Sequence, residues 1–305
     1  MAAAAPVGED RADAVAPRPW VWAAIGAIAG FASGLLGVGG GFVIVPLQVV
    51  WARTPARRAS GTSLAAILPI AVVGAAHYYF GASSPQVDLR VAVLLVLGSA
   101  PGAYLGARAV SRVPTRALQG ILAVALVGVG VHEIAAVLVP GLATRTGQTA
   151  HLGLLASALV TGAAGLIGAT GSLVGVGGGI LLVPTMVLGL GLGQHMAQGT
   201  SLLAILPTAA VGATVHRRHG NVDLRAAAWI GGVGAPASVL GASLALALPQ
   251  PALLFVFGCF LLVAAGRMWP GRAVGRLDRP GVSAGCRQRC GRVLRAFRRP
   301  AAESR

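Results

Sequence analysis

The chain has 305 residues, of which 55% are hydrophobic and only 10% are charged, and its mean hydropathy is +0.77. Soluble domains carry about 25% charged residues, so the composition excludes a soluble protein and indicates an integral membrane protein. The net charge is +16, but 11 of the 24 basic residues, all of them arginines, lie from Arg267 onward. No aromatic stacking pattern accompanies them, so we expect this tail to contact anionic lipid and not nucleic acid.

Long apolar segments follow a short N-terminal lead. Residues 1–19 are rich in Ala and Pro and lack the cleavage pattern of a secretory signal, so we expect a disordered lead. A helix needs about 20 apolar residues to cross a bilayer. The apolar segments are 20–51, 61–80, 89–108, 117–139, 152–190, 199–216, 225–244 and 252–268. The sequence therefore predicts an all-α, polytopic fold with about eight membrane segments.

The two halves of the chain are copies of one unit. Gly37 pairs with Gly175, and "GTSL" at 61 pairs with "GTSL" at 199, both at an offset of 138, whereas Asp88 pairs with Asp223 at an offset of 135. Matches held in one register along most of each half indicate a duplication. The predicted units are membrane repeat 1 (20–140), a linker (141–151), membrane repeat 2 (152–268) and a basic cytoplasmic tail (269–305).

The first segment of each repeat contains "GVGGG", at 37–41 and at 175–179, with a proline further along. Glycine destabilises a helix by about 1 kcal/mol relative to alanine, and proline removes a helical hydrogen bond. Close helix packing is the alternative explanation of such glycines. Because four glycines fall within five positions in each run, we favour a broken helix.

The arginines decide whether the broken segment crosses the membrane. If it crosses and the C-terminal tail is cytoplasmic, six arginines face outward, which violates the positive-inside rule: Arg53, Arg57, Arg58, Arg108, Arg112 and Arg116. If it enters and returns as a re-entrant hairpin, all six become cytoplasmic. Each repeat then has three crossings, so the two homologous repeats are inverted, as in many secondary transporters. In the longer second segment, two short crossings stay open and give the same parity.

A glycine turn of this kind can present backbone N–H groups and a helix N-terminus to an anion. Hydroxyl groups of the two "GTSL" motifs can add donors, although capping of their own helices is an equal alternative. The predicted solute-binding residues are Gly39, Gly40, Gly41, Thr62, Ser63, Gly177, Gly178, Gly179, Thr200 and Ser201. The glycine runs lack the Lys of a P-loop, and the three cysteines form no metal motif, so we expect neither a cofactor nor a metal.

Few ionisable residues lie within the apolar segments. Asp88 and Asp223, each two residues before an arginine, are expected to form ion pairs at the membrane boundary. Glu133 beside His132 is expected at a solvated helix end, with proton coupling as the alternative. His195 is expected in a loop. No cluster of catalytic side chains is apparent, so the sequence does not predict an enzyme.

These motifs resemble the TauE/SafE family of membrane transporters, in which a "GxGGG…VP" run is followed by "GTS". Both halves match, with "GVGGGFVIVP" and "GTSLAAILP" in the first and "GVGGGILLVP" and "GTSLLAILP" in the second. The resemblance covers essentially the whole membrane part. It implies transport of sulfur-containing anions, such as sulfite or organosulfonates, across the cytoplasmic membrane.

We therefore expect a multi-pass secondary transporter of a small anion in the cell membrane, working by alternating access, with its C-terminus in the cytoplasm. The alternative is a non-transporting membrane scaffold or a subunit of a larger complex. The sequence leaves open whether the chain forms a homo-oligomer.

Overall fold

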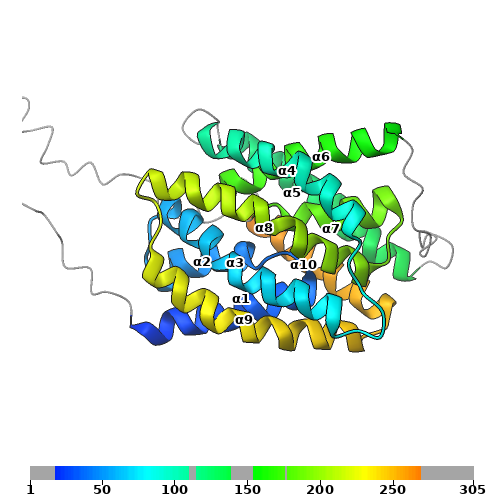
Figure 1. The fold of residues 1–305 in the computed structure, drawn as a ribbon, viewed down its shortest axis with the longest axis horizontal. Coiled ribbons are helices and arrows are strands. Elements are labelled where there is room, and N and C mark those ends of the chain that lie inside the picture. Colours follow the sequence, from blue (N-terminus) through cyan, green and yellow to red (C-terminus); the bar gives the residue numbers. More distant parts are fainter. Residues whose placement is uncertain (1–17, 110–114, 139–153, 176, 269–305) are drawn as a thin grey trace, which may run out of the picture.

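The computed structural model describes residues 18–109, 115–138, 154–175 and 177–268, and this part is helical with no strand. Most helices lie along the long axis of the molecule (Figure 1). They are α1 (Pro19–Leu36), α2 (Gly41–Trp51), α3 (Ala56–Phe80), α4 (Leu89–Ala109), α5 (Thr115–Leu138), α6 (Leu154–Val174), α7 (Gly179–Leu190), α8 (Gln194–Arg218), α9 (Leu224–Ala247) and α10 (Gln250–Met268). The predicted linker and basic tail, and all but the end of the predicted lead, lie outside the described residues.

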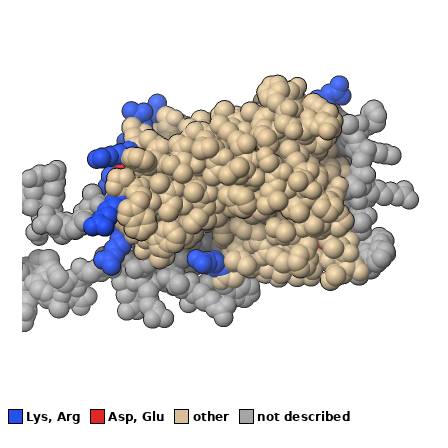
Figure 2. All heavy atoms as spheres, turned by 90° about the horizontal axis from the view of Figure 1, so that it is seen from below, with Lys and Arg blue, Asp and Glu red and all other residues tan. Residues whose placement is uncertain are grey.

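Six of the described helices are long and apolar enough to cross a membrane: α1, α3, α4, α8, α9 and α10. Their outer faces carry exposed aliphatic side chains, such as Val72, Leu97, Leu105, Leu240 and Val263, as lipid contact requires. Figure 2 shows a wide band of the surface without Lys, Arg, Asp or Glu, and most of the basic side chains gathered at one end. These findings confirm the predicted all-α, polytopic membrane protein.

Small residues bring helices of the two halves into backbone contact. Gly26, Gly30 and Gly34 of α1 lie against Ile230, Gly234 and Ser238 of α9, so closely that a Cβ added to any of these glycines would overlap the α9 backbone. Along this contact, the residue numbers increase in the same direction on both helices. Helices α1 and α9 are therefore parallel and use the small-residue packing typical of membrane helices.

The same contact occurs between α4 and α6. Gly98, Gly102 and Gly106 of α4 lie against Thr161, Gly165 and Ala169 of α6, again in rising order along both helices. Each of these pairs joins the broken first segment of one half to the third long helix of the other half. The two halves are therefore interlocked and do not form separate bundles.

Helices α3 and α8 occupy the centre. Gly74 of α3 approaches Leu202 of α8, whereas Gly61, near the start of α3, approaches His216, near the end of α8, so α3 and α8 are antiparallel. Helix α3 is parallel to α9, because Ser238 Oγ donates to Ile70 O at 3.2 Å and Ser243 lies 2.8 Å from His77 Nε2 further along both helices. Helix α1 therefore runs in the same direction as α3.

This geometry fixes the course of the chain between α1 and α3. Near Ile230 and Gly231 of α9, α1 contributes Gly26 and α3 contributes Ala66, so both helices begin at the same end of the molecule. The intervening α2 must bring the chain back to that end. In Figure 1, α2 lies beside α1 and α3.

Candidate functional site

Each half contains a glycine turn at the predicted helix break. We call residues 37–40 turn 1, and Gly175, Gly177 and Gly178 turn 2. In turn 1, the φ angles of Gly37, Gly39 and Gly40 are +72°, +74° and +75°. In turn 2, Gly175, Gly177 and Gly178 have φ angles of +80°, +73° and +85°. Residues with a side chain rarely adopt such φ angles, so these glycines are what allows the chain to leave the helix.

A short helix starts directly after each turn. Helix α2 begins at Gly41 after an N-cap at Gly40, and α7 begins at Gly179 after an N-cap at Gly178; neither has a side-chain cap or an acidic residue in its first turn. The first N–H groups of a helix lack intrahelical acceptors and carry the positive end of its dipole. Both turns thus offer buried N–H donors without a competing carboxylate.

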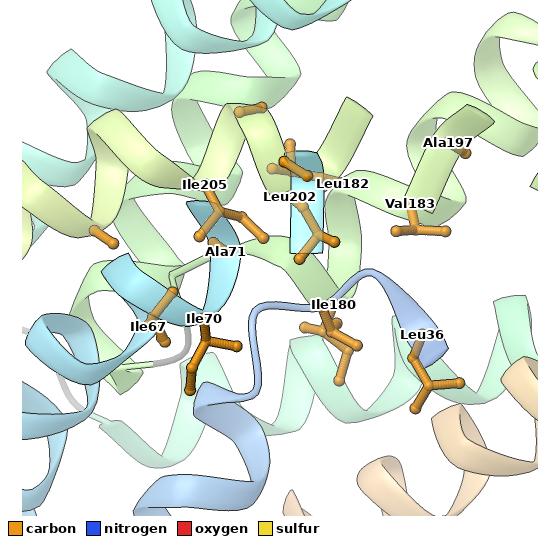
Figure 3. Packing of buried hydrophobic residues seen from close by; sticks show 14 of the residues in the cluster. Leu36, Ile67, Ile70, Ala71, Ile180, Leu182, Val183, Ala197, Leu202 and Ile205 are labelled. Atoms are coloured by element: carbon orange, nitrogen blue, oxygen red, sulfur yellow. The ribbon is translucent and has the colours of Figure 1, made fainter. Parts of the chain in front are cut away.

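The two turns meet at the centre of the molecule. A Cβ on Gly39 would lie 3.3 Å from side-chain atoms of both Ile67 and Ile205, and one on Gly177 would lie 3.2 Å and 3.7 Å from Ile205 and Ile67. Ile67 of α3 and Ile205 of α8 are equivalent at the offset of 138 and are fully buried. Figure 3 shows them in the apolar cluster between α3 and α8. The glycines predicted to bind solute therefore come together, around an apolar pair.

The threonines of the two "GTSL" motifs connect the halves. The Thr62 hydroxyl accepts from the Asp223 N–H at 3.0 Å, and the Thr200 hydroxyl accepts from the Asp88 N–H at 2.9 Å. Helix α3 begins at Ala56 and α8 at Gln194, each without a side-chain cap. The prediction that these motifs open their helices is thus wrong, and so is the alternative that their hydroxyls cap them. Each motif lies inside its helix and holds the start of a helix in the other half.

The two serines of the motifs differ. Ser63 donates to the carbonyl of Gly175 in turn 2 at 3.0 Å, whereas Ser201 Oγ has no partner among the described residues. Both side chains are fully buried. Ser63 therefore contacts the opposite half's turn, as a binding residue near that turn would, but its proton is already used.

The predicted boundary ion pair of Asp223 has a different partner. Its Oδ1 accepts from the N–H groups of Arg225 and Ala226, which makes it the N-cap of α9. Its Oδ2 pairs with Arg58 of the other half at 3.1 Å. The carboxylate is thus held by the backbone of Arg225 and the guanidinium of Arg58. Asp88 caps α4 in the same way, accepting from the N–H groups of Arg90 and Val91.

Two further predictions are wrong. Glu133 is only 1% exposed, and its Oε1 and the Nδ1 of His132 have no partner among the described residues; the neighbouring backbone at Gly258 of α10 covers it. His195 lies within α8 and not in a loop, with its Nε2 3.0 Å from the Ala245 carbonyl. Both errors arise because neighbouring helices, which the local sequence does not reveal, cover these positions.

Sequence reasoning missed a polar group next to turn 1. Tyr78 Oη lies 2.9 Å from the carbonyl of Gly34 and 2.9 Å from Gln198 Oε1, and all of these atoms are buried. The equivalent positions of Tyr78 and Gln198 in the other half are His216 and Ser60. A search for residues that recur in both halves misses these positions, because the two halves differ there. In the described residues, no three His, Cys, Asp or Glu side chains are placed to hold a metal ion.

The long apolar helices, the lipid-compatible exterior and the buried glycine turns define a multi-pass membrane protein. The model of the family Sulfite exporter TauE/SafE matches residues 2–132 and 160–297. The chain therefore belongs to the TauE/SafE family of membrane transporters, as its motifs suggested.

Individual relatives agree with this assignment. A probable membrane transporter protein of Xylella fastidiosa is 31% identical over 202 residues, covering 65% of this chain and 74% of that protein. The probable membrane transporter protein YunE of Bacillus subtilis is 26% identical over 268 residues, covering 78% and 95%. The probable membrane transporter protein MamO of Magnetospirillum gryphiswaldense is 32% identical over 120 residues, covering 38% and 19%. No solved structure matches the chain.

Proposed function

We propose that the protein is a secondary transporter of small anions, with sulfur oxoanions or organosulfonates as its solutes, and that it works by alternating access. The two halves are inverted repeats in the cell membrane, and the glycine segments are re-entrant hairpins that reach its middle. The arginine-rich end and the C-terminal tail face the cytoplasm, where the tail contacts anionic lipid. The protein is a carrier and not an enzyme.

The observation that carries this proposal is the opposite direction of equivalent helices. The central helices α3 and α8 are equivalent and antiparallel, since Gly61 lies near His216 and Gly74 near Leu202. The first helix of each half is parallel to the third long helix of the other half. Two inverted halves around a central site can rock between states open to either side.

The arginine distribution supports the orientation. Exposed arginines near the starts of α1, α3 and α9 and the end of α8 lie at one end of the molecule: Arg18, Arg53, Arg57, Arg58, Arg217, Arg218 and Arg225. Arg90, at the start of α4, lies at the opposite end. An excess of arginine is typical of the cytoplasmic side.

The glycine turns support an anionic solute. They present uncapped N–H groups at the start of α2 and α7, where the helix dipole favours negative charge. No basic side chain is buried there among those that the structure describes, since each arginine with a described side chain is exposed. A fixed positive charge would hold an anion tightly, whereas neutral donors allow it to leave again. Of the residues predicted to bind solute, we assign this role to Gly39, Gly40, Gly41, Gly177, Gly178 and Gly179 through the backbone and to Thr62, Thr200 and Ser201 through their hydroxyls, whereas the Ser63 proton is already used by the Gly175 carbonyl.

Counterflow in liposomes tests the proposal. Purified protein is reconstituted, loaded with unlabelled sulfite, and assayed for the entry of labelled sulfite, with methanesulfonate, sulfoacetate and sulfate as competitors. We expect entry far above that of empty liposomes and competition by the sulfonates. The variant Gly40→Ala should lose transport, because the φ of Gly40 is +75° and the new Cβ would lie 2.8 Å from the Ala29 carbonyl. Gly232→Ala, where a Cβ meets no atom of the described part of the chain within 4 Å, is the matched control.

A non-transporting scaffold would give the opposite result in this assay. Folded protein that gives no counterflow of any of these anions would contradict the transporter assignment and favour a structural role in a larger complex.

A further inference from the structure

Three buried side chains near turn 1 each have a polar atom without a hydrogen-bond partner. Ser33 Oγ, Ser201 Oγ and the amide nitrogen Nε2 of Gln198 have none among the described residues, and the three side chains are 0% exposed. Buried polar groups are almost always hydrogen-bonded, to protein or to something the protein holds. We call these three side chains the turn-1 donors. Other unpartnered buried groups of the described part are spread over α2, α4, α5, α6 and the two ends of α8.

The turn-1 donors converge on the first glycine turn. The backbone and side chain of Gln198 lie directly on Gly37, since a Cβ there would be 2.5 Å from Gln198 Cα and 2.9 Å from its Cγ. The Cβ of Ser33 would lie 3.4 Å from one on Gly40. Ser201 is one helical turn beyond Gln198 and one turn before Ile205, which contacts Gly39, so it lies on the same face of α8.

Tyr78 fixes the orientation of the Gln198 amide. Tyr78 has one hydroxyl proton, so it cannot donate fully both to the Gly34 carbonyl and to Gln198 Oε1, each at 2.9 Å. The Tyr78 proton is therefore shared between these two acceptors. Because Tyr78 holds Oε1 of the Gln198 amide, the amide nitrogen Nε2 is left as a donor for a further partner.

Turn 2 does not repeat this arrangement. At the positions equivalent to Ser33 and Gln198 it has Gly171 and Ser60. Ser63, the equivalent of Ser201, already donates to the Gly175 carbonyl at 3.0 Å. The pseudo-symmetric fold thus carries an asymmetric set of polar groups: near turn 2 the Ser172 hydroxyl is unpartnered, but Gln198 and Tyr78 are replaced there by Ser60 and His216.

We propose that the turn-1 donors bind the oxygen atoms of one oxoanion head group, such as sulfite or a sulfonate, and that turn 2 has no equivalent set of side-chain donors. This inference rests on the proposed anion transport and names the residues that select the solute. Two hydroxyls, an amide and the N–H groups that open α2 are neutral donors in several directions, which suits an oxygen-bearing group with one or two negative charges. Tyr78 acts as a positioning residue for Gln198.

Calorimetric titration of purified protein with sulfite and with methanesulfonate tests the site. Gln198→Met, Ser201→Ala and Ser33→Ala should each raise Kd about tenfold, which corresponds to one hydrogen bond to a charged group. Ser172→Ala removes a buried, unpartnered hydroxyl three residues before turn 2, and Thr214→Val removes an exposed one on α8; both controls should keep the wild-type Kd. Tyr78→Phe should weaken binding in the wild type but not in Gln198→Met.

The outcomes are distinct. If wild-type protein binds and transports the anions and the turn-1 variants do so equally well, these donors hold only water and the inference is wrong, while the transport function stands. If Ser172→Ala weakens binding as much as Ser33→Ala, the site is not confined to turn 1. If folded wild-type protein neither binds nor moves any of the anions, the proposed function itself fails, and the inference with it.

Discussion

The hydroxyl of Thr62 accepts a hydrogen bond from the N–H of Asp223 at 3.0 Å, although the two residues lie in different halves of the chain. The equivalent pair, Thr200 and Asp88, repeats the contact at 2.9 Å. Each half therefore holds the residue that precedes and caps a long helix in the other half. The two "GTSL" motifs therefore connect the two halves of the chain.

Loss of these contacts should destabilise the protein. Thr62→Val and Thr200→Val each keep the side-chain shape but leave the N–H of Asp223 or Asp88 without its acceptor, which costs about 1–3 kcal/mol. The expected result is a lower melting temperature of the detergent-solubilised protein for both variants. Thr214→Val, which removes an exposed hydroxyl bonded within its own helix, should melt like the wild type. Unchanged melting of both Thr62 and Thr200 variants would mean that the contact contributes nothing.

Helix contacts through glycine predict a sharp contrast along α1 and α9. Gly30→Ala places a methyl group into the backbone of Gly234, so the helices must separate, at a cost of about 1–3 kcal/mol. Gly232→Ala on α9 meets no atom of the described part of the chain within 4 Å and should stabilise the helix by up to about 1 kcal/mol. Melting temperatures check both signs. Equal tolerance of the two substitutions would contradict the close packing of α1 on α9.

The Asp223 carboxylate has two roles that substitution can separate. Arg58→Ala removes an ion pair whose side chains are 52% and 33% exposed, so it should cost less than about 1 kcal/mol. Asp223→Ala also removes the cap of α9 and should cost about 1 kcal/mol more. Asp223→Asn, which keeps a capping oxygen, should fall between them. A larger loss for Arg58→Ala than for Asp223→Ala would contradict this assignment.

Glu133 gives a prediction about function. Its carboxyl group is buried with an unpartnered oxygen, so Glu133→Leu should raise the melting temperature, because burying a polar group without a partner costs free energy. We expect counterflow to persist, because Glu133 has no part in the proposed site. Loss of transport in a variant that melts higher would instead assign the carboxyl to proton coupling, as intramembrane carboxylates often serve.

Much of the fold could be predicted because the apolar composition of a segment is enough to indicate a membrane helix. The eight apolar segments correspond to α1–α2, α3, α4, α5, α6–α7, α8, α9 and α10. The helix breaks at Gly37 and Gly175 could be predicted because glycine adopts a positive φ angle at its own position, whatever its neighbours are. The predicted helix starts are less accurate. Helix α3 begins at Ala56 and α8 at Gln194, because the polar residues before "GTSL" are already helical.

The site was predicted only in part, because its contacts cross between halves. That the glycines of both turns meet at Ile67 and Ile205 depends on how α3 packs on α8, and this is not encoded in either motif. The partners of Thr62 and Asp223 were mistaken for local ones for the same reason. Tyr78 and Gln198 were missed because they differ from their equivalents, His216 and Ser60.

The side of the membrane reached by equivalent residues tests the central claim, that the repeats are inverted. Ser84 and His219 are equivalent at the offset of 135 and both are exposed. In a background with Cys259, Cys286 and Cys290 replaced, Ser84→Cys and His219→Cys are labelled in intact cells with a membrane-impermeant maleimide. We predict labelling of Ser84→Cys from outside, and of His219→Cys only after the membrane is opened. Labelling of both from the same side would contradict the inverted arrangement and the transport mechanism built on it.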